Sequence, residues 1–539
     1  MRRLWISALP TAGIVTVAIV LFSNPGGTPK VAANDSGRAK AGEWSMFGGT
    51  PSRNMVNLVE KNPATDWKVP EGSGDDGANI KWVAKLGSRA YGGPTIAGGK
   101  IYIGTNNHSP RNPRDTIKRK DGKTQPVDKG VLMCFDEATG KFLWQHVNDK
   151  LEIGQVCDWP NEGVCSTPTV VGDHVYYVSN RCEVVCVDAN GFANGNQGVQ
   201  DEKYKDPSDA DVIWRYDMMK ELNVFPHNMA ACCPLVVGDL IFIVTGNGVD
   251  EGHINLPSVD APSFIALNRH TGKLIWRDNS PGKNIMHGQW SNPTYIEVNG
   301  QPQVVFPGGD GWLRSFVPHT GELIWRFDAN PKDSKYDLGG RGTRSDFIAT
   351  PVAYNGKIYI GTGQDPEHFE GVGHLWCIDP SKKFDVSPDK VVDGSVFPPK
   401  TEPNPNSAAV WHFGGPEANP KQAGRDYVFG RTMSTCAIHD NLLYACDLAG
   451  YFHCLDATTG QLHWKHDLKG AVWGSPMWID GKVYIATDDG DVYIFQHGKQ
   501  KSEPQKIEIG QPIRGTPIAV NGVLYVKSES NLFAIREKK

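Results

Sequence analysis

The stretch GYFHCLDATTGQLHW, Gly450 to Trp464, decides the fold. Apolar and polar residues alternate in it, the chain turns at Asp-Ala-Thr-Thr-Gly, and alternation resumes until a tryptophan ends the segment. This pattern is typical of two antiparallel strands joined by a short turn. The ending Thr-Gly-x-x-x-Trp recurs, and longer versions of the same segment also end in tryptophan. The tryptophans are Trp144, Trp276, Trp325 and Trp464 in the short form, and Trp214 and Trp411 in the longer form.

A hairpin pattern precedes each of these strand pairs. It consists of small residues, a proline, a short apolar run, a two-residue turn and a second apolar run, as in GSPMWIDGKVYIATD from Gly474. Turn pairs such as Asp480-Gly481 suit tight turns with positive φ. The other clear copies begin at Ser166, Cys232, Ala349 and Gly515, and weaker ones at Gly92, Ser291 and Ser434. Four short antiparallel strands repeated eight times predict an all-β, eight-bladed β-propeller of four-stranded blades.

The ends of the repeat array predict how the ring closes. The last copy, 515–535, has three strands, whereas Asn79 to Gly87 resembles a fourth strand and precedes the first complete copy. We expect this N-terminal strand to complete the last blade, because that pairing removes an exposed sheet edge. The expected organisation is a signal peptide or anchor over 1–33, a lead-in over 34–78, and the propeller over 79–539.

The repeated Asp-x-x-Thr-Gly-Lys-x-x-Trp segment resembles the docking motif of the PQQ-like (quinoprotein alcohol dehydrogenase-like) eight-bladed propellers. The resemblance covers roughly residues 44–539. It implies two kinds of function, because the scaffold hosts both dehydrogenases that use pyrroloquinoline quinone (PQQ) and non-catalytic envelope proteins. We expect a ligand-binding or protein-interaction scaffold, with a PQQ-dependent alcohol or sugar dehydrogenase as the alternative. No cofactor is required by the sequence, and the resemblance admits PQQ with calcium.

The N-terminus indicates export. Arg2 and Arg3 precede the apolar run from Leu4 to Phe22, and small residues at Val31 to Ala33 offer a cleavage site. An uncleaved anchor is the alternative, so we expect membrane contact only through this segment and a periplasmic or cell-envelope location. The formal net charge of −5 argues against non-specific nucleic-acid binding. We expect a monomer whose partner is a small anionic ligand or an exported protein.

The loops that enter the first strand of each blade should converge at the mouth of the central channel. Their arginines could bind carboxylates and their tryptophans could stack on a flat ligand. The alternative is that these side chains pair with one another and tie the loops together. The candidate residues are Arg89, His227, His287, Trp290, Arg344, Arg431, Trp473 and Arg514.

The cysteines fall into two groups with different interpretations. Cys134, Cys186, Cys377 and Cys454 occupy one position of the third strand, where other copies have alanine or serine, which indicates small buried side chains. The adjacent pair Cys232 and Cys233 aligns with other small residues, so packing explains it. The resemblance offers a second interpretation, a disulfide between adjacent cysteines against the cofactor.

One loop, GQDPEHFEGVGH from Gly363, gathers carboxylates and imidazoles. Asp365, Glu367 and His368 are its candidate metal ligands, and a solvated loop is the alternative. No catalytic residue can be assigned, although Glu162, Asp346 and Asp365 are candidates for a base.

Overall fold

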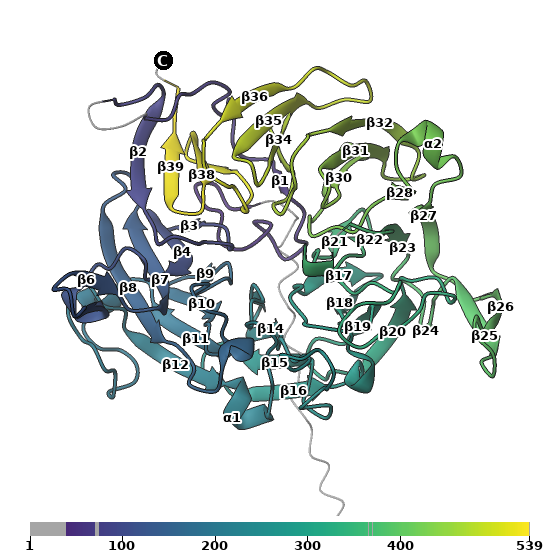
Figure 1. Ribbon diagram of the computed structural model, residues 1–539, viewed down its shortest axis with the longest axis horizontal. Helices are drawn as coiled ribbons and strands as arrows, with labels where there is room; N and C mark the ends of the chain where they lie inside the picture. Colours follow the sequence, from purple (N-terminus) through teal and green to yellow (C-terminus); the bar gives the residue numbers. More distant parts are fainter. Residues whose placement is uncertain (1–38, 71–74, 365, 369, 538–539) are drawn as a thin grey trace, which may run out of the picture. The chain divides into compact units, whose positions relative to one another are not determined.

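The computed structural model describes residues 39–70, 75–364, 366–368 and 370–537. These residues form eight mainly antiparallel sheets arranged around a central channel, as Figure 1 shows. The exceptions are the parallel pairs of β1 (Val56–Asn57) with β33 (Met477–Ile479) and of β20 (Leu323–Asp328) with β24 (Phe384–Asp385). The predicted eight-bladed propeller is confirmed.

In the first four blades the strands run from the channel outward. Blade 1 contains β3 (Thr95–Ala97), β4 (Lys100–Asn106), β7 (Lys129–Asp136) and β8 (Phe142–Asp149); blade 2 contains β9 (Thr169–Val171), β10 (His174–Val178), β11 (Glu183–Asp188) and β12 (Val212–Asp217). Blade 3 contains β13 (Leu235–Val237), β14 (Leu240–Val244), β15 (Phe264–Asn268) and β16 (Leu274–Asp278); blade 4 contains β17 (Thr294–Val298), β18 (Gln301–Pro307), β19 (Trp312–Phe316), β20 (Leu323–Asp328) and β24 (Phe384–Asp385).

The last four blades repeat the plan. Blade 5 contains β21 (Val352–Tyr354), β22 (Lys357–Gly361), β23 (His374–Ile378), β27 (Ala409–Pro416) and β28 (Tyr427–Phe429); blade 6 contains β29 (Ala437–His439), β30 (Leu442–Cys446), β31 (Tyr451–Asp456) and β32 (Leu462–Asp467). Blade 7 contains β33 (Met477–Ile479), β34 (Lys482–Ala486), β35 (Asp491–Gln496), β36 (Gln505–Glu508) and β1 (Val56–Asn57); blade 8 contains β37 (Ile518–Val520), β38 (Val523–Lys527), β39 (Asn531–Ile535) and β2 (Ile80–Lys85).

Short elements decorate the blades. Two separate hairpins extend from the blades, and the helices each span one turn or little more. The hairpins are β5 (Thr116–Lys118) with β6 (Thr124–Pro126), and β25 (Asp389–Asp393) with β26 (Lys400–Pro403). The helices are α1 (Met218–Leu222), α2 (Pro420–Ala423), η1 (Pro113–Asp115), η2 (Gln155–Cys157), η3 (Gly191–Asn194), η4 (Gly282–Asn284) and η5 (Pro366–His368).

The ring closes as the sequence predicts. Strand β2 pairs antiparallel with β39, with Trp82 opposite Ala534, so the N-terminal strand becomes the outermost strand of blade 8. This pairing covers the outer edge of β39, which would otherwise be exposed.

Tryptophans of the fourth strands join neighbouring blades. Each is the third residue of its strand and not the last, so the expectation that a tryptophan ends the strand is wrong. Trp411 Nε1 of blade 5 donates to the carbonyl oxygen of Ala457 in blade 6 at 2.9 Å. Its ring covers Gly460, where an added Cβ would lie 2.7 Å from the indole. Gly460 also has φ of 74°, a left-handed conformation that favours glycine. The recurring Thr-Gly-x-x-x-Trp segment is therefore a docking device between blades.

Residues 44–57, here named the channel segment, run along the inner strands of all eight blades. In Figure 1 this purple stretch lies at the centre of the ring. Ser45 O accepts from Val170 N of blade 2, and Pro51 O accepts from Tyr295 N of blade 4. The remaining contacts are Trp44 with Ile96, Arg53 with Cys233, Ser52 with Ala353, Asn54 with Ile438, Met55 with Trp478 and Asn57 with Ala519.

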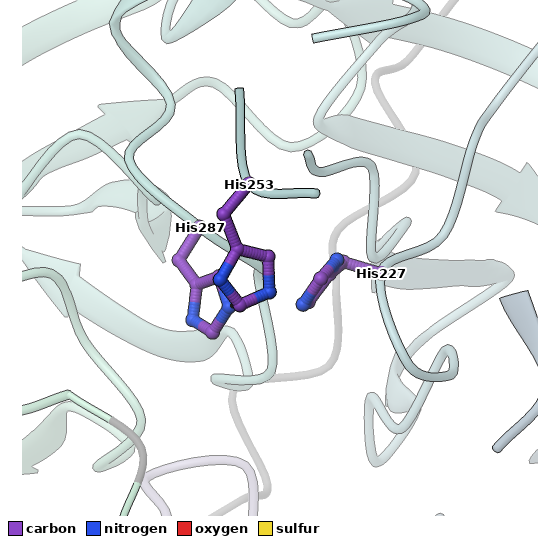
Figure 2. A group of neighbouring side chains, drawn as sticks. All are labelled: His227, His253 and His287. Atoms are coloured by element: carbon purple, nitrogen blue, oxygen red, sulfur yellow. Dashed lines mark hydrogen bonds between the residues drawn. The ribbon is translucent and has the colours of Figure 1, made fainter. Parts of the chain in front are cut away.

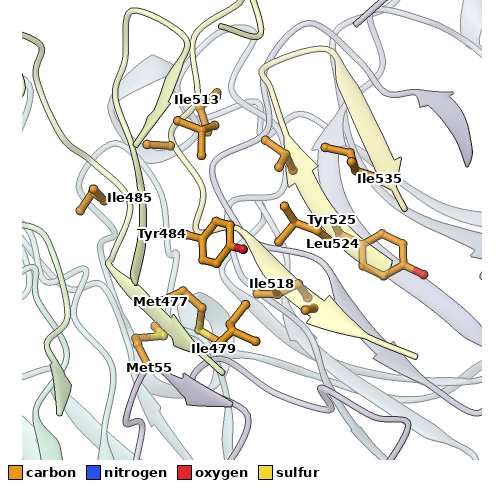
Figure 3. Close-up of a cluster of buried hydrophobic side chains, with 14 of the residues drawn as sticks. Met55, Met477, Ile479, Tyr484, Ile485, Ile513, Ile518, Leu524, Tyr525 and Ile535 are labelled. Carbon is orange, nitrogen blue, oxygen red and sulfur yellow. The ribbon is translucent and has the colours of Figure 1, made fainter. Parts of the chain in front are cut away.

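The channel segment also joins the hydrophobic core. Figure 3 shows Met55 beside Met477 and Ile479 of β33, with Ile518 of β37 close by. All four side chains are buried. Burial of apolar side chains from 44–57 in this core stabilises the attachment of the segment to the last blades.

The expected signal peptide or anchor over 1–33 lies outside the described residues. Within 39–70, 75–364, 366–368 and 370–537, no helix has the length and apolar character needed to cross a membrane.

Candidate functional site

A cavity of about 370 Å³ lies in the central channel, above the channel segment. Trp44, Phe47 and Met55 of that segment form part of its wall. The loops entering the first strands supply most of the rest, and Pro366 and Glu367 come from the loop between β22 and β23. Aromatic side chains dominate these loops: Tyr91, Trp159, Trp290 and Trp473.

Arg514 lies in this wall with its charge already balanced. The guanidinium is 4.8 Å from the ring centre of Trp473 and 5.4 Å from that of Tyr91. It forms ion pairs with Asp488 at 2.8 Å and Glu529 at 2.6 Å. It therefore holds the aromatic wall in place, and two carboxylates compete with any anionic ligand for it.

The other predicted arginines also have protein partners. Arg89 pairs with Glu162, and Arg344 pairs with Asp328. Arg431 donates to Ser345 Oγ and to the carbonyl oxygen of His368. None of the three arginines is among the described residues that line the cavity. These contacts agree with the alternative in which the arginines pair with protein groups and hold the loops together.

Two buried cations that were not among the predicted site residues, Arg53 and Lys527, donate hydrogen bonds to backbone carbonyls of the cavity wall. Arg53 donates to the carbonyl oxygens of Phe47, Cys233 and Pro293 at 2.8, 3.0 and 3.1 Å. Lys527 Nζ donates to the carbonyl oxygens of Ala90 and, at 3.1 Å, Gly92. Among the residues that the structure describes, neither cation has a carboxylate within ion-pair distance.

Burial shifts the pKa of both groups downward because it disfavours the charged form. The pKa of Arg53 falls to about 10, so the guanidinium stays charged at neutral pH. The pKa of Lys527 falls to about 7. A sequence signal for Lys527 exists, since the other clear copies have Val178, Val244, Gly361 and Ala486 at this buried repeat position. Arg53 lies in a segment without repeats and carried no such signal.

Both cysteines of the adjacent pair are free thiols. Cys233 lines the cavity, and its sulfur accepts a hydrogen bond from Thr167 N at 3.3 Å. The sulfur of Cys232 accepts from Val244 N at 3.3 Å, inside blade 3. The two sulfurs serve different neighbours, which agrees with packing of small residues against the channel. The four cysteines predicted in the third strands are buried.

Beside the cavity, behind Trp290, lies a group of histidines. Trp290 Nε1 donates to the carbonyl oxygens of His227 and Met229, both at 3.2 Å. The predicted residues His227 and His287 lie together here, with ring centres 4.3 Å apart. His253 joins them from the loop between β14 and β15. His253 carries no signal in the sequence, because no spacing along the chain brings it to the other two histidines.

The loop predicted to bind a metal contributes residues both to the cavity lining and to the histidine group. Glu367 lines the cavity, whereas the His368 ring lies 4.8 Å from that of His287. Asp365 lies outside the described residues. Of the candidate bases, Glu162 lines the cavity and Asp346 pairs through its backbone with Gly363.

A family model described as "Outer membrane protein assembly factor BamB" matches residues 198–381 and 404–539, more than half of the chain. The chain belongs to this family. The resemblance to PQQ-like propellers is thereby confirmed. The curated relatives include tetrathionate hydrolase of Acidithiobacillus ferrooxidans, 22% identical over 339 residues, which are 54% of this chain and 61% of that protein.

Quinone-dependent enzymes are also similar. The dehydrogenase subunit of alcohol dehydrogenase (quinone) from Gluconacetobacter polyoxogenes is 25% identical over 344 residues, or 56% of this chain and 39% of that one. The chain thus spans less than two thirds of the length of these curated relatives.

Solved structures share the fold. Europium-containing methanol dehydrogenase has a TM-score of 0.57 at 13% identity, with 91% of each chain covered. BamB from Moraxella catarrhalis has a TM-score of 0.50 at 11% identity, with 85% of this chain and 97% of that one covered.

Proposed function

We propose that this protein binds a small, flat, anionic organic ligand in its central cavity. The observation that carries the proposal is the combination of aromatic walls with Arg53 and Lys527. Aromatic rings offer faces on which a planar ligand can stack. The volume of about 370 Å³ suits a ligand of a few fused rings.

The charged groups around the cavity determine which ligand charge is favoured. A buried cation that has only carbonyl partners keeps an uncompensated charge, and an anion placed nearby lowers its energy. Arg53 and Lys527 have this environment, and the residues to which they donate, Phe47, Gly92 and Cys233, line the cavity. An anionic ligand is therefore favoured over a neutral or cationic one.

A PQQ-dependent oxidoreductase is the second candidate. The relatives named as quinone-dependent alcohol dehydrogenases favour it, and PQQ is itself a planar tricarboxylate that matches the walls and the charge. The calcium that would accompany it fits less well, because calcium prefers six to eight oxygen ligands. Among the described lining residues only Glu162 and Glu367 carry carboxylates, and Glu162 is paired with Arg89.

The test is a calorimetric titration of PQQ into the purified protein, with and without calcium. Saturable binding at micromolar or lower concentration that calcium does not change supports an anion site of this kind. Lys527→Met should weaken that binding roughly tenfold, which corresponds to about 1.4 kcal/mol. Lys506→Met, on the outer surface of blade 7, is the matched control and should bind like the original chain.

Two further outcomes separate the candidates. Calcium-dependent binding, followed by dye-linked oxidation of an alcohol or sugar, would favour the oxidoreductase. If the folded protein binds no PQQ, the PQQ-dependent oxidoreductase is excluded. If other planar carboxylates also fail to bind, the proposed anion-binding cavity is excluded as well. The family match to an assembly factor would then direct the search to a protein partner.

We further propose that the chain is exported and acts as a monomer in the periplasm or cell envelope. The basic start at Arg2 and Arg3 followed by the apolar run supports export. Cell fractionation with sequencing of the mature N-terminus tests the location. Light scattering of the purified protein tests the monomer.

A further inference from the structure

Three imidazole rings from two adjacent blades meet beside the cavity, as Figure 2 shows. His227 precedes β13, His253 lies between β14 and β15, and His287 precedes β17. One ligand atom from each ring can be chosen so that all three lie within 4.8 Å of one another. His227 and His287 are buried, and His253 is half-buried.

The hydrogen bond of His227 fixes which ring nitrogen can bind a metal. Its Nδ1 lies 2.8 Å from the carbonyl oxygen of Val249. A carbonyl oxygen only accepts, so Nδ1 carries the proton, and the neutral ring has its lone pair on Nε2. Histidines that bind metals almost always donate their second ring N–H to such a partner, which orients the ring and raises its basicity.

The spacing of the other two rings matches a coordination polyhedron. His253 Nε2 and His287 Nε2 are 3.3 Å apart. Two nitrogens that each lie about 2.0–2.1 Å from a tetrahedral zinc ion are separated by about 3.3 Å. The ring planes of His253 and His287 cross at 76°, and the ring centres lie 4.6 Å apart.

The surrounding backbone holds this arrangement. Val249 donates its N–H to the carbonyl oxygen of His287 at 3.1 Å while its own carbonyl oxygen accepts from His227. A Cβ at Gly248 would lie 2.5 Å from His287 O, and a Cβ at Gly339 would lie 2.7 Å from His253 Cβ. Glycine at both positions is what allows the segments to approach this closely.

We propose that His227, His253 and His287 bind one divalent first-row transition-metal ion of the zinc class. Imidazole nitrogens suit zinc, copper and nickel, whereas calcium prefers oxygen. Three protein ligands leave a fourth position open, as in zinc sites that bind a water molecule or substrate. This site is separate from the anion-binding cavity and does not depend on the function proposed above.

The competing explanation is a histidine cluster held by hydrogen bonds alone, since one Nε2–H can donate to the other Nε2 across 3.3 Å. The two explanations differ in metal stoichiometry. A bonded cluster takes up no ion, whereas the proposed site takes up one per chain.

The experiment uses the untagged chain, freed of metal with a chelator and then titrated with zinc and, separately, cobalt. One equivalent of zinc should bind and raise the thermal midpoint. Cobalt should give the visible absorption of a four-coordinate ion, and calcium should not compete. His253→Gln should weaken zinc binding by at least about tenfold, because losing a ligand costs more than losing an outer partner. His253 lies on a half-buried loop, so this variant is expected to fold.

His412→Gln is the matched control. His412 Nε2 contacts His374 Nδ1 at 2.9 Å. His374 is buried and His412 is exposed, and this pair has no third imidazole within reach among the described residues. This variant should keep the full equivalent of zinc. The proposal is overturned if the metal-free chain binds no more zinc than His253→Gln does. It is also overturned if His412→Gln loses the ion equally.

Discussion

At the scale of single residues, the glycine beneath a docked tryptophan is needed for two reasons: there is no space for a Cβ, and φ is positive. Gly460→Ala introduces a Cβ 2.7 Å from Trp411 at φ of 74°. Gly481→Ala meets the same backbone strain at φ of 77°, with no atom within 4 Å. We expect Gly460→Ala to lose about 1–3 kcal/mol more than Gly481→Ala, because only the former overpacks a blade interface. Urea denaturation of both variants measures the difference, and equal losses would show that strain alone acts.

Lys527 makes the free energy of unfolding depend on pH, and the burial of this side chain sets the direction of that dependence. Burial is the largest cause that lowers its pKa, from 10.5 to about 7. Between these values the unfolded chain binds more protons than the folded chain, so the free energy of unfolding rises with pH. The lysine thus destabilises the fold most below pH 7, and this cost is relieved toward pH 10.5.

Comparison with Lys527→Met isolates this effect. Across that window the original chain should gain stability relative to the variant by up to about 1.4 kcal/mol per pH unit. Denaturation at pH 6, 8 and 9.5 provides the measurement. A constant difference between the two proteins would mean that the folded chain keeps Lys527 protonated throughout.

At the scale of elements, the hairpin β25–β26 is expected to be dispensable. Its strands are mostly exposed, and the chain enters and leaves it at adjacent points, since Asn404 N donates to Pro388 O at 2.9 Å. Replacing residues 389–403 with two glycines should shift the thermal midpoint by less than about 2 °C. A larger shift would reveal that the hairpin supports blade 5.

Strand β2, in contrast to this hairpin, is expected to be essential for stability. Trp82 opposes Ala534, donates to the carbonyl oxygen of Glu137 in blade 1 and contacts Tyr525. Trp82→Ala therefore removes a contact to each neighbour of the closing strand, and we expect a loss of about 3–5 kcal/mol. Hydrogen exchange should show β2 and β39 losing protection together. Retained protection in β39 would mean that the ring does not depend on this closure.

The elements also show what the sequence could predict. Turn pairs such as Asn355-Gly356 have positive φ at both positions, as their composition predicts, because few other residues accept that conformation. His253 and Arg53 could not be placed in the same way. Their positions depend on ring closure and on a segment without repeats, and both are contacts between distant parts of the chain.

At the scale of the whole molecule, the channel segment connects blades that do not touch one another. It contacts the inner strand, or its start, in all eight blades. Removing residues up to 58 should leave the β-sheet content but lower the thermal midpoint by about 5 °C or more and broaden the transition. Circular dichroism during heating provides the measurement. An unchanged, equally sharp transition would show that the blades cooperate without the segment.

The same segment has a consequence for synthesis on the ribosome. It emerges early, yet Asn57 finds its partner Ala519 near the end of the chain, 462 residues later. This contact cannot form until blade 8 has been translated. A prematurely terminated chain would expose an apolar N-terminal stretch with nothing to cover it, which is the kind of surface that chaperones and proteases recognise. Only a chain that includes blade 8 can form the contact between Asn57 and Ala519.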